Sequence, residues 1–338
     1  ILGHLTWFGS VQSYMPKSPA HICARNEANS VYKNLKKMGI VNENLKPMPY
    51  DDMIAIPVTE GELVLEFESN IKHDPNLIFQ SVLDNPPKKW QILGDMLVLQ
   101  ENTNIEGWPL DKIAEEIGVK KIGIQAPIDE GIMRQSNLNL VFGESGWVIH
   151  KENQVEYEFD ATKVMYSAGN VTERIRMAKM DMTDEIVIDA YSGIGYYTLQ
   201  ILKHSNAKKV HACDINPDSI EALRRGLKRN QLEERCEIHQ GDNRNTLREL
   251  KSVADRVILG LIPSSLNSWG LAINCLKKSG GIIHIHMNVH ENEIDSWSEK
   301  TSDWFATVSG KNTRILHLEK VKKYSPGIRH VVLDLEIY

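Results

Sequence analysis

Three short segments in the second half of the chain carry residues suited to holding a nucleoside. The segment 189–195 (DAYSGIG) follows the apolar run Ile186–Ile188, Asp214 ends the next apolar run, and Gly241-Asp242-Asn243 follows the third. Glycine lets the backbone pass close to a ligand, and a carboxylate can accept both hydroxyls of a ribose. A carboxylate beside an amide can bind the amino group and a ring nitrogen of adenine.

Each acidic residue alone has a simpler reading as a helix N-cap. Three of them after consecutive apolar runs favour a binding site instead. The residue three positions after Gly195 is Thr198, so the third glycine of a dinucleotide fingerprint is absent. The pattern therefore favours a single nucleoside, and S-adenosylmethionine fits, with Gly193 in the turn that approaches it.

The elements that must position these residues alternate between strand and helix. Short apolar runs predict strands at 186–188, 209–213, 236–239, 256–259 and 281–289. Helices are expected between them, and strand–helix alternation implies a parallel sheet with right-handed crossovers. The last two predicted strands, 315–321 and 330–337, would close this sheet as an antiparallel hairpin.

The first half of the chain has a different, mostly β pattern. Strands at 52–57 and 61–67 are predicted to form one hairpin and 147–151 with 154–159 another, while 92–100 is predicted as a single strand. A helix over 170–180 would lead into the second half. We therefore predict an α+β accessory domain over 1–160 and a nucleoside-binding domain over 161–338.

Composition limits the functional classes. The 338 residues include 39 Lys+Arg and 45 Asp+Glu, a net charge of −6, which excludes the broad basic surface of a non-specific nucleic-acid binder. No apolar run is long enough to span a membrane, and no signal peptide is recognised. The four cysteines form no CxxC pair. These features predict a cytoplasmic protein that needs no disulfides.

A resemblance rests on several motifs in the second half. The stretch resembles class I S-adenosylmethionine enzymes of the tRNA (guanine-N1) methyltransferase group, and within it the tRNA wybutosine-synthesizing protein 2 family. The matching segments are 166–174 (YSAGNVTER), 189–199 (DAYSGIGYYTL), 210–217 (VHACDINP), 239–244 (HQGDNR), 254–265 (ADRVILGLIPSS) and 280–289 (GGIIHIHMNV).

The resemblance implies a fold and an activity. The fold would be a class I Rossmann-like α/β sheet, mostly parallel with the last strand antiparallel, beside a smaller N-terminal α+β domain that contacts tRNA. The activity would be transfer of the 3-amino-3-carboxypropyl group of S-adenosylmethionine to 4-demethylwyosine, next to the anticodon of phenylalanine tRNA. A tRNA guanine-N1 methyltransferase and an inactive tRNA-binding module are the alternatives.

Two departures from the methyltransferase pattern bear on this choice. Gly169 stands where those enzymes carry an arginine, and Gly260-Leu261-Ile262-Pro263 replaces their Asn-Leu-Pro. Loss of the arginine removes a cation near the target base and makes room for the aminocarboxypropyl arm. Both changes are interpreted as turning the sulfonium so that a different one of its attached carbons faces the target base. Asn170 is also expected to cap the helix that follows.

The resemblance also implies roles for individual residues, although it assigns no proton acceptor. Arg174, where the family usually has lysine, would pair with the methionine carboxylate, and Asp214 would hold the ribose. The predicted cofactor-binding residues are Ser167, Arg174, Gly193, Asp214, Asp242 and Asn243, and the predicted substrate-binding residues are Pro263, Ser264 and Ser265. No metal is expected, since His284, His286 and His290 lack partner ligands and are predicted to be satisfied within a strand.

Overall fold

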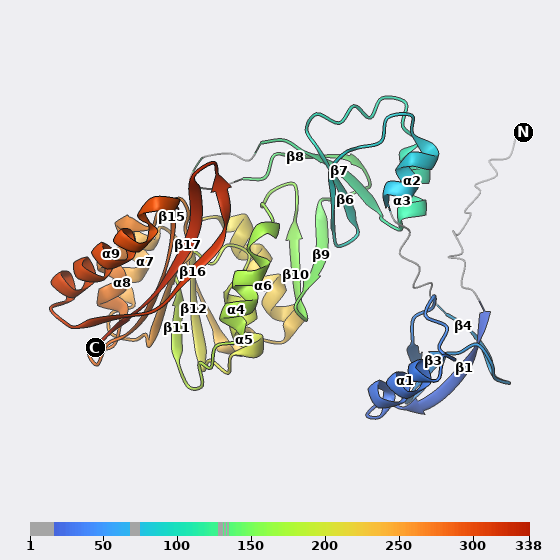
Figure 1. The fold of residues 1–338 in the computed structure, drawn as a ribbon, viewed down its shortest axis with the longest axis horizontal. Coiled ribbons are helices and arrows are strands. Elements are labelled where there is room, and N and C mark those ends of the chain that lie inside the picture. The colour runs from blue at the N-terminus through green and yellow to red at the C-terminus, as the bar shows by residue number, and fades with distance from the viewer. Residues whose placement is uncertain (1–16, 68–74, 128–130, 132, 134) are drawn as a thin grey trace, which may run out of the picture. The chain divides into compact units, whose positions relative to one another are not determined.

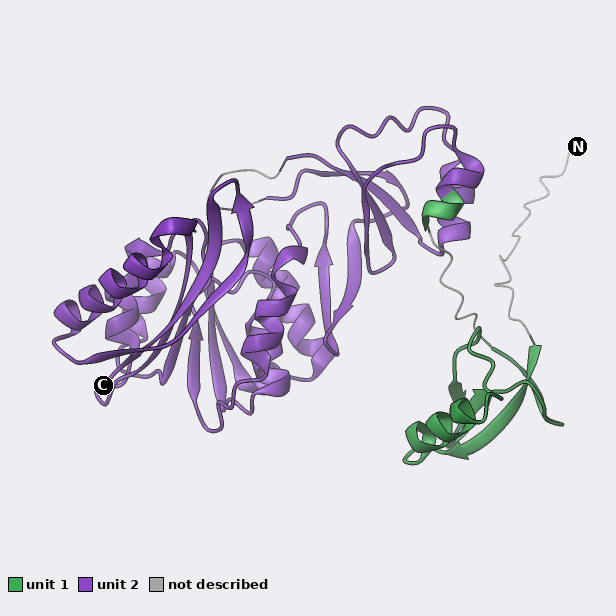
Figure 2. Cartoon of the chain, in the orientation of Figure 1, with its two compact units in different colours: residues 1–78 green, residues 79–338 purple. Residues whose placement is uncertain are grey.

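The chain folds into two compact units, residues 1–78 and residues 79–338 (Figure 2). The computed structural model describes residues 17–67, 75–127, 131, 133 and 135–338. Each unit has its own hydrophobic core: Cys23, Leu35 and Ile56 belong to one in the first unit, and Val187 and Leu199 belong to one in the second.

Residues 17–67 of the first unit form a four-stranded antiparallel sheet with one helix. Its strand order is β2-β3-β1-β4, and the elements are β1 (Lys17–Ala24), α1 (Ala28–Lys37), β2 (Met48–Tyr50), β3 (Met53–Pro57) and β4 (Val64–Glu66). The predicted hairpin of 52–57 with 61–67 is wrong, because β1 lies between β3 and β4 and pairs with both. Sequence proximity suggested a pairing that the more distant β1 prevents.

The second unit begins with a smaller mixed sheet of order β5-β6-β7-β8. Helix α2 (Pro75–Val82) crosses the division between the units, and the elements after it are β5 (Trp90–Leu93), β6 (Met96–Gln100), α3 (Leu110–Ile117), β7 (Lys121–Gln125) and β8 (Leu138–Phe142). The single strand predicted over 92–100 is a hairpin instead. Gly94 has φ +56° and turns the chain there, and a Cβ on it would meet the Ile149 carbonyl oxygen.

The predicted hairpin at 147–159 is confirmed. Strands β9 (Trp147–Glu152) and β10 (Val155–Asp160) pair in register from Trp147 with Asp160 to Glu152 with Val155. The Asn230 amide on the neighbouring helix donates to the Glu156 carbonyl, and its carbonyl accepts from the Glu156 N–H, so this helix is fixed to β10.

A seven-stranded sheet forms the rest of the unit (Figure 1). Its order is β13-β12-β11-β14-β15-β17-β16, parallel except that β17 runs antiparallel to both neighbours. This topology confirms the predicted fold class. The strands are β11 (Ile186–Asp189), β12 (Lys209–Asp214), β13 (Cys236–Gln240), β14 (Arg256–Leu259), β15 (Gly281–His290), β16 (Thr313–Ser325) and β17 (Ile328–Ile337).

Helices cover both faces of this sheet (Figure 1). One face packs against α4 (Val171–Ala178), α5 (Thr198–His204) and α6 (Pro217–Asn230), and the other against α7 (Asn243–Glu249), α8 (Trp269–Cys275) and α9 (Ile294–Ser309). Strand β12 lies on one side of β11 and β14 on the other. Open α/β sheets bind ligands beyond the strand carboxyl ends at such a reversal.

None of the helices in the described parts of the chain is long and apolar enough to cross a membrane. The predicted domain boundary between residues 160 and 161 stays a prediction. The point where the compact units divide is earlier, at Ile78 and Phe79.

Candidate functional site

The three predicted segments follow adjacent strands at one edge of the sheet. Strand β11 ends at Asp189, β12 at Asp214 and β13 at Gln240, and their order in the sheet is β13-β12-β11. Because these strands are parallel, their carboxyl ends share one edge. The expectation from spacing that the three segments meet is confirmed.

The turn after β11 contains two glycines, Gly193 and Gly195, whose surroundings differ. Gly193 has φ +54° and Gly195 φ +94°, both in the region that favours glycine. A Cβ on Gly195 would lie 2.7 Å from Leu223 Cδ1 and 2.9 Å from Leu199 Cγ, so only glycine lets this turn pack on α5 and α6. Gly193 is partly exposed, and its N–H donates to Asp214 Oδ2 at 2.8 Å.

Asp214 joins this turn to the end of β12. Its Oδ1 accepts the Asn216 N–H at 2.9 Å, in addition to the Gly193 bond on Oδ2. Burial raises the pKa of the Asp214 carboxyl, and the backbone donors act in the opposite direction. Each carboxylate oxygen has two acceptor positions, and with the N–H groups of Gly193, Ile215 and Asn216 as donors the side chain can still accept a further hydroxyl group. This is the chemistry expected of a ribose-binding carboxylate.

Asp189 has a different role from Asp214. It is fully buried, its Oδ2 accepts the Thr198 hydroxyl at 2.8 Å, and burial raises its pKa to about 6. The contact links the end of β11 to the start of α5. Asp189 therefore stabilises the turn between β11 and α5 from its buried side.

Asp242 and Asn243 begin α7. Asp242 is the N-cap, and its Oδ1 accepts the Arg244 N–H at 2.8 Å. The Arg244 side chain also donates to it, which holds the pKa of Asp242 below its ordinary value. Asn243 Nδ2 donates to the Ala190 carbonyl at 3.4 Å, beside the glycine turn. The capping role of Asp242 is confirmed, and adenine binding by the pair stays a prediction.

The Arg174 side chain makes hydrogen bonds and aromatic-ring contacts within the chain. It is buried, and its guanidinium donates to both Glu152 oxygens at 2.8 and 2.5 Å and to the Ser167 carbonyl at 2.8 Å. It also lies over the rings of Tyr166 and Tyr196, at 5.5 and 5.3 Å. What the geometry establishes is that Arg174 fixes the turn carrying Ser167. Its predicted contact with a ligand carboxylate stays a prediction.

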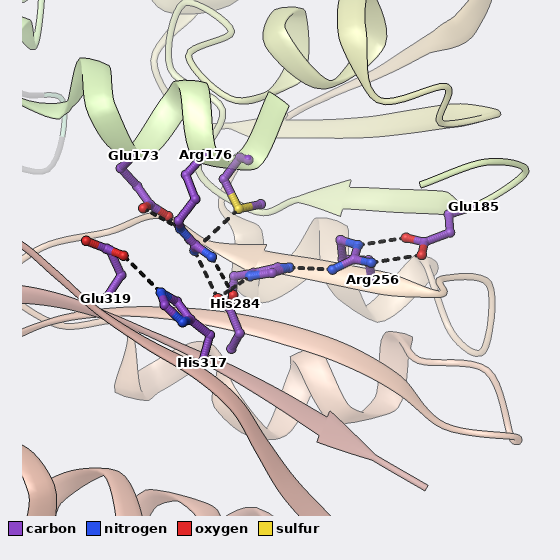
Figure 3. Close-up of polar contacts among 9 residues, drawn as sticks. Glu173, Arg176, Glu185, Arg256, His284, His317 and Glu319 are labelled. Atoms are coloured by element: carbon purple, nitrogen blue, oxygen red, sulfur yellow. Dashed lines mark hydrogen bonds and ion pairs between the residues drawn. The ribbon is translucent and has the colours of Figure 1, made fainter. Parts of the chain in front are cut away.

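A chain of ion pairs fixes the helix that follows this turn (Figure 3). Arg176 on α4 bonds to Glu173 at 2.8 Å and to Asp334 on β17 at 2.6 Å. His284 Nδ1 lies 2.6 Å from Asp334 Oδ1, and Arg256 NH1 lies 2.7 Å from His284 Nε2. A neutral His284 protonated on Nδ1 satisfies both contacts, and burial lowers its pKa. The network holds α4 against β15 and β17.

The loop after β14 carries the predicted substrate residues. Pro263 is exposed, and its carbonyl accepts the Asn288 N–H at 3.0 Å. Ser264 is partly exposed and pairs with Met287. Ser265 is buried and its hydroxyl accepts the Trp269 Nε1–H at 3.2 Å, so it supports α8. The structure therefore leaves Pro263 and Ser264 accessible, and Ser265 lies behind them.

Sequence reasoning did not bring together a group of polar side chains that includes residues beside this loop. Several buried atoms there have no hydrogen-bond partner among the described residues: Asn170 Oδ1, Tyr197 Oη, His286 Nε2, both amide atoms of Asn288, and His330 Nδ1. We call these five residues the polar cluster. His286 Nδ1 lies 3.0 Å from His330 Nε2, and His330 is the register partner of Asn288.

The polar cluster corrects two expectations. His284 is satisfied on both nitrogens as predicted, but His286 is satisfied on one only. Asn170 occupies the N-cap position of α4, yet its side chain makes no capping bond. The sequence could have indicated part of this cluster. In the pattern His284-x-His286-x-Asn288, alternate residues of a strand place three polar side chains on one face. The partner His330 could not be assigned without the strand order.

Among the described residues, one histidine-containing group could hold a metal ion. His211, Glu237 and His239 on β12 and β13 bring one ligand atom each within 4.8 Å of one another. Glu237 is bonded to Lys209 at 2.5 Å. The group is remote in sequence from His284, His286 and His290.

Comparison with known proteins points to one family. The family described as the TRM5/TYW2 methyltransferase domain matches residues 148–307. The tRNA wybutosine-synthesizing protein 2 homolog of Danio rerio is 40% identical over 295 residues, covering 74% of this chain and 71% of its own length.

Two further relatives agree with this match. The tRNA wybutosine-synthesizing protein 2/3/4 of Arabidopsis thaliana is 42% identical over 270 residues and covers 76% of this chain, but this chain spans only 27% of that longer protein. The crystal structure of M. jannaschii TYW2 in complex with AdoMet superposes with a TM-score of 0.61 and 29% identity, covering 74% of this chain and 99% of its own.

Proposed function

Because the chain belongs to the tRNA wybutosine-synthesizing protein 2 family, we propose that it is an S-adenosylmethionine-dependent tRNA aminocarboxypropyltransferase. It moves the 3-amino-3-carboxypropyl group of S-adenosylmethionine to 4-demethylwyosine beside the anticodon of phenylalanine tRNA, in wybutosine biosynthesis. Support comes from the relatives' names and from the M. jannaschii complex with AdoMet. The proposed location of the reaction is the cytoplasm, together with its tRNA substrate.

The residues at the carboxyl edge of the sheet fit S-adenosylmethionine. Asp214 accepts a ribose hydroxyl with the acceptor position left beside the Gly193, Ile215 and Asn216 donors. Asp242 and Asn243 lie at the adenine end, while Ser167 and Arg174 form the approach to the methionine end. When bound, this group supplies a sulfonium whose three attached carbons are all electrophilic.

The chain's task is then to orient one of these carbons toward the base. Pro263 and Ser264 line the slot for a base turned out of the anticodon loop, with Ser265 behind them. Gly169 leaves space where related methyltransferases have an arginine. Residues 1–160 are the accessory region that contacts tRNA, and residues 161–338 bind the co-substrate.

The observation that carries this proposal is the glycine turn bonded to Asp214 at the reversal point of the sheet. The test is incubation of the protein and 4-demethylwyosine tRNA with S-adenosylmethionine labelled separately in the methyl and in the carboxypropyl carbons. We expect only the carboxypropyl label in tRNA. Guanine-37 tRNA lacking the tricyclic base is the control substrate and should stay unlabelled.

Each alternative predicts a different result. Methyl label in the guanine-37 tRNA would identify a guanine-N1 methyltransferase. Neither label in tRNA, together with no calorimetric heat on titration with S-adenosylmethionine, would identify an inactive tRNA-binding module.

A further inference from the structure

Lys322, a cation beside the candidate site, has no counter-ion among the residues that the structure describes. Lys322 lies on β16 and is half-buried, and its ammonium makes no hydrogen bond or ion pair with the residues that the structure describes. It is the register partner of His330, so it lies beside the polar cluster. Burial and the charge of Arg174 lower the pKa of Lys322. An ammonium in this setting gains from an incoming anion.

The nearby carboxylates are engaged elsewhere. Glu152 is bonded to Arg174, and Asp334 and Glu173 are bonded to Arg176. Glu319 on the same strand is bonded to His317 (Figure 3). The anion that would satisfy Lys322 must therefore come from outside the described chain.

Gly169 creates the space in which this ammonium lies. A Cβ on Gly169 would be 2.5 Å from Lys322 Nζ, 3.3 Å from Cδ and 3.4 Å from Cε. The lysine stem thus packs along the backbone of the turn Ala168–Asn170, and any side chain at 169 would displace it. The position that holds an arginine in related methyltransferases is here a glycine with the ammonium of another strand beside it.

We propose that Lys322 binds the carboxylate of the aminocarboxypropyl arm of S-adenosylmethionine, and that Gly169 is the residue that admits it. This inference rests on the proposed function and adds the residue that orients the arm. Arg174 fixes the turn through the Ser167 carbonyl, and Lys322 supplies the free charge beside the same turn. Holding the tail of the arm restricts which carbon next to sulfur can face the base.

The arm's carboxylate is a better match than an RNA phosphate. Lys320 and Lys323 on the same strand are exposed, as phosphate-contacting lysines usually are, whereas Lys322 is half-buried against Gly169. Charge-assisted hydrogen bonds are strongest where water is excluded. The exposed lysines therefore provide matched controls on one strand.

The test compares two nucleosides that differ in the arm. S-adenosylhomocysteine carries the carboxylate, and methylthioadenosine lacks the whole aminocarboxypropyl group. In calorimetric titrations of the full chain, we expect Lys322→Met to weaken S-adenosylhomocysteine binding about ten- to a hundredfold. Methylthioadenosine binding should be unchanged. Lys323→Met should change neither affinity, and Lys322→Arg should restore part of the loss.

A second variant fills the space beside residue 169 and leaves the Lys322 ammonium unchanged. Gly169→Ala should also weaken S-adenosylhomocysteine binding selectively. The ligand-free melting temperature of each variant checks its folding.

Two results would overturn the inference. Equal weakening of both nucleosides by Lys322→Met would show that the lysine supports the whole site, and weakened tRNA binding with unchanged nucleoside affinities would identify a phosphate contact. Label transfer by the wild-type protein separates these results from failure of the proposed function, since the wild-type protein keeps Lys322 and transfers label whichever role this lysine has.

Discussion

Asp214 is the single residue on which the candidate site depends most. Its carboxylate joins the Gly193 turn to the start of the next loop and retains a free acceptor position. Replacing it with alanine removes the proposed ribose contact. We expect Asp214→Ala to weaken S-adenosylmethionine binding about ten- to a hundredfold in calorimetry, since hydrogen bonds to charged groups contribute about 1.5–3 kcal/mol.

The same variant should bind tRNA nearly as well as the wild type, measured by gel shift at fixed salt. Asp218→Ala is the matched control, because Asp218 lies four residues away and pairs with Lys163. If cofactor and tRNA affinity fall together, the separation of roles between Asp214 and the tRNA-contacting region is wrong.

Residues differ in how far the sequence could predict them. Asp214 and Asp242 were predictable because each lies at the carboxyl end of a strand, and parallel strands bring their carboxyl ends together. Lys322 and His330 were not, because β17 inserts between β15 and β16 and the chain returns to the site from its far end. No spacing in the sequence connects Lys322 with Gly169.

At the scale of elements, the β9–β10 hairpin is joined to α4 by a buried ion pair. Glu152 at the end of β9 accepts from Arg174, and both side chains are almost fully buried. Removing one partner leaves the other charge uncompensated in the core. We expect Glu152→Ala to lower the free energy of unfolding of the second unit by about 3–5 kcal/mol, measured by urea titration with tryptophan fluorescence.

The control for this prediction is another glutamate of the same hairpin. Glu158 pairs with Arg225 and Arg229 at the protein surface, so Glu158→Ala should cost much less. Trp147 and Trp269 lie in the second unit, and their emission follows its unfolding. Losses of equal size in both variants would contradict a special role for the buried pair.

The histidines of β15 and β17 predict a pH dependence. Burial lowers the pKa of His284 and His286, and it lowers that of His330 from 6.5 to about 4. Between pH 6.5 and about pH 4, the unfolded chain therefore binds more protons at His330 than the folded chain does. Stability is therefore full above about pH 6.5 and is lost as the pH falls toward 4.

For His330 alone, this amounts to roughly 2 kcal/mol between pH 7.5 and pH 5. Urea unfolding over this range should show a smaller slope with pH for His330→Gln than for the wild type. The exposed His290 is the control, and His290→Gln should keep the wild-type slope. A slope that is unchanged in His330→Gln would show that this imidazole is not held neutral by its surroundings.

Elements of the second half followed closely from the sequence, and those of the first half did so less well. Strands β11, β12, β14 and β15 contain buried apolar runs, and helices alternate with these strands and with the edge strand β13, a pattern with one common solution. In the first half, the reversal is marked by Gly94-Asp95, a two-residue turn signal between apolar runs that the prediction of a single strand over 92–100 passed over. Strand β1 includes Pro19 and polar residues, and its place between β3 and β4 depends on long-range pairing.

At the scale of the whole molecule, the two compact units predict separable binding activities. All nine predicted site residues lie between Ser167 and Ser265, and so does the glycine turn, within the second unit and its own cores. The net charge of −6 means that tRNA must be held by local contacts, and we propose that residues 1–160 supply many of them.

A variant comprising residues 75–338, which keeps α2 whole, should therefore bind S-adenosylmethionine with about wild-type affinity, because a ligand's affinity is set by its own contacts. Its tRNA affinity should fall about tenfold or more, and the fall should become larger at low salt, because the wild type, with more phosphate contacts, gains more affinity there. Calorimetry and gel shifts on the same preparations measure both. Loss of S-adenosylmethionine binding in a variant that still melts cooperatively would show that the first unit contributes to the nucleoside site. Unchanged tRNA binding would remove residues 17–67 from the proposed contact region and leave the β5–β8 sheet as the accessory part that holds tRNA.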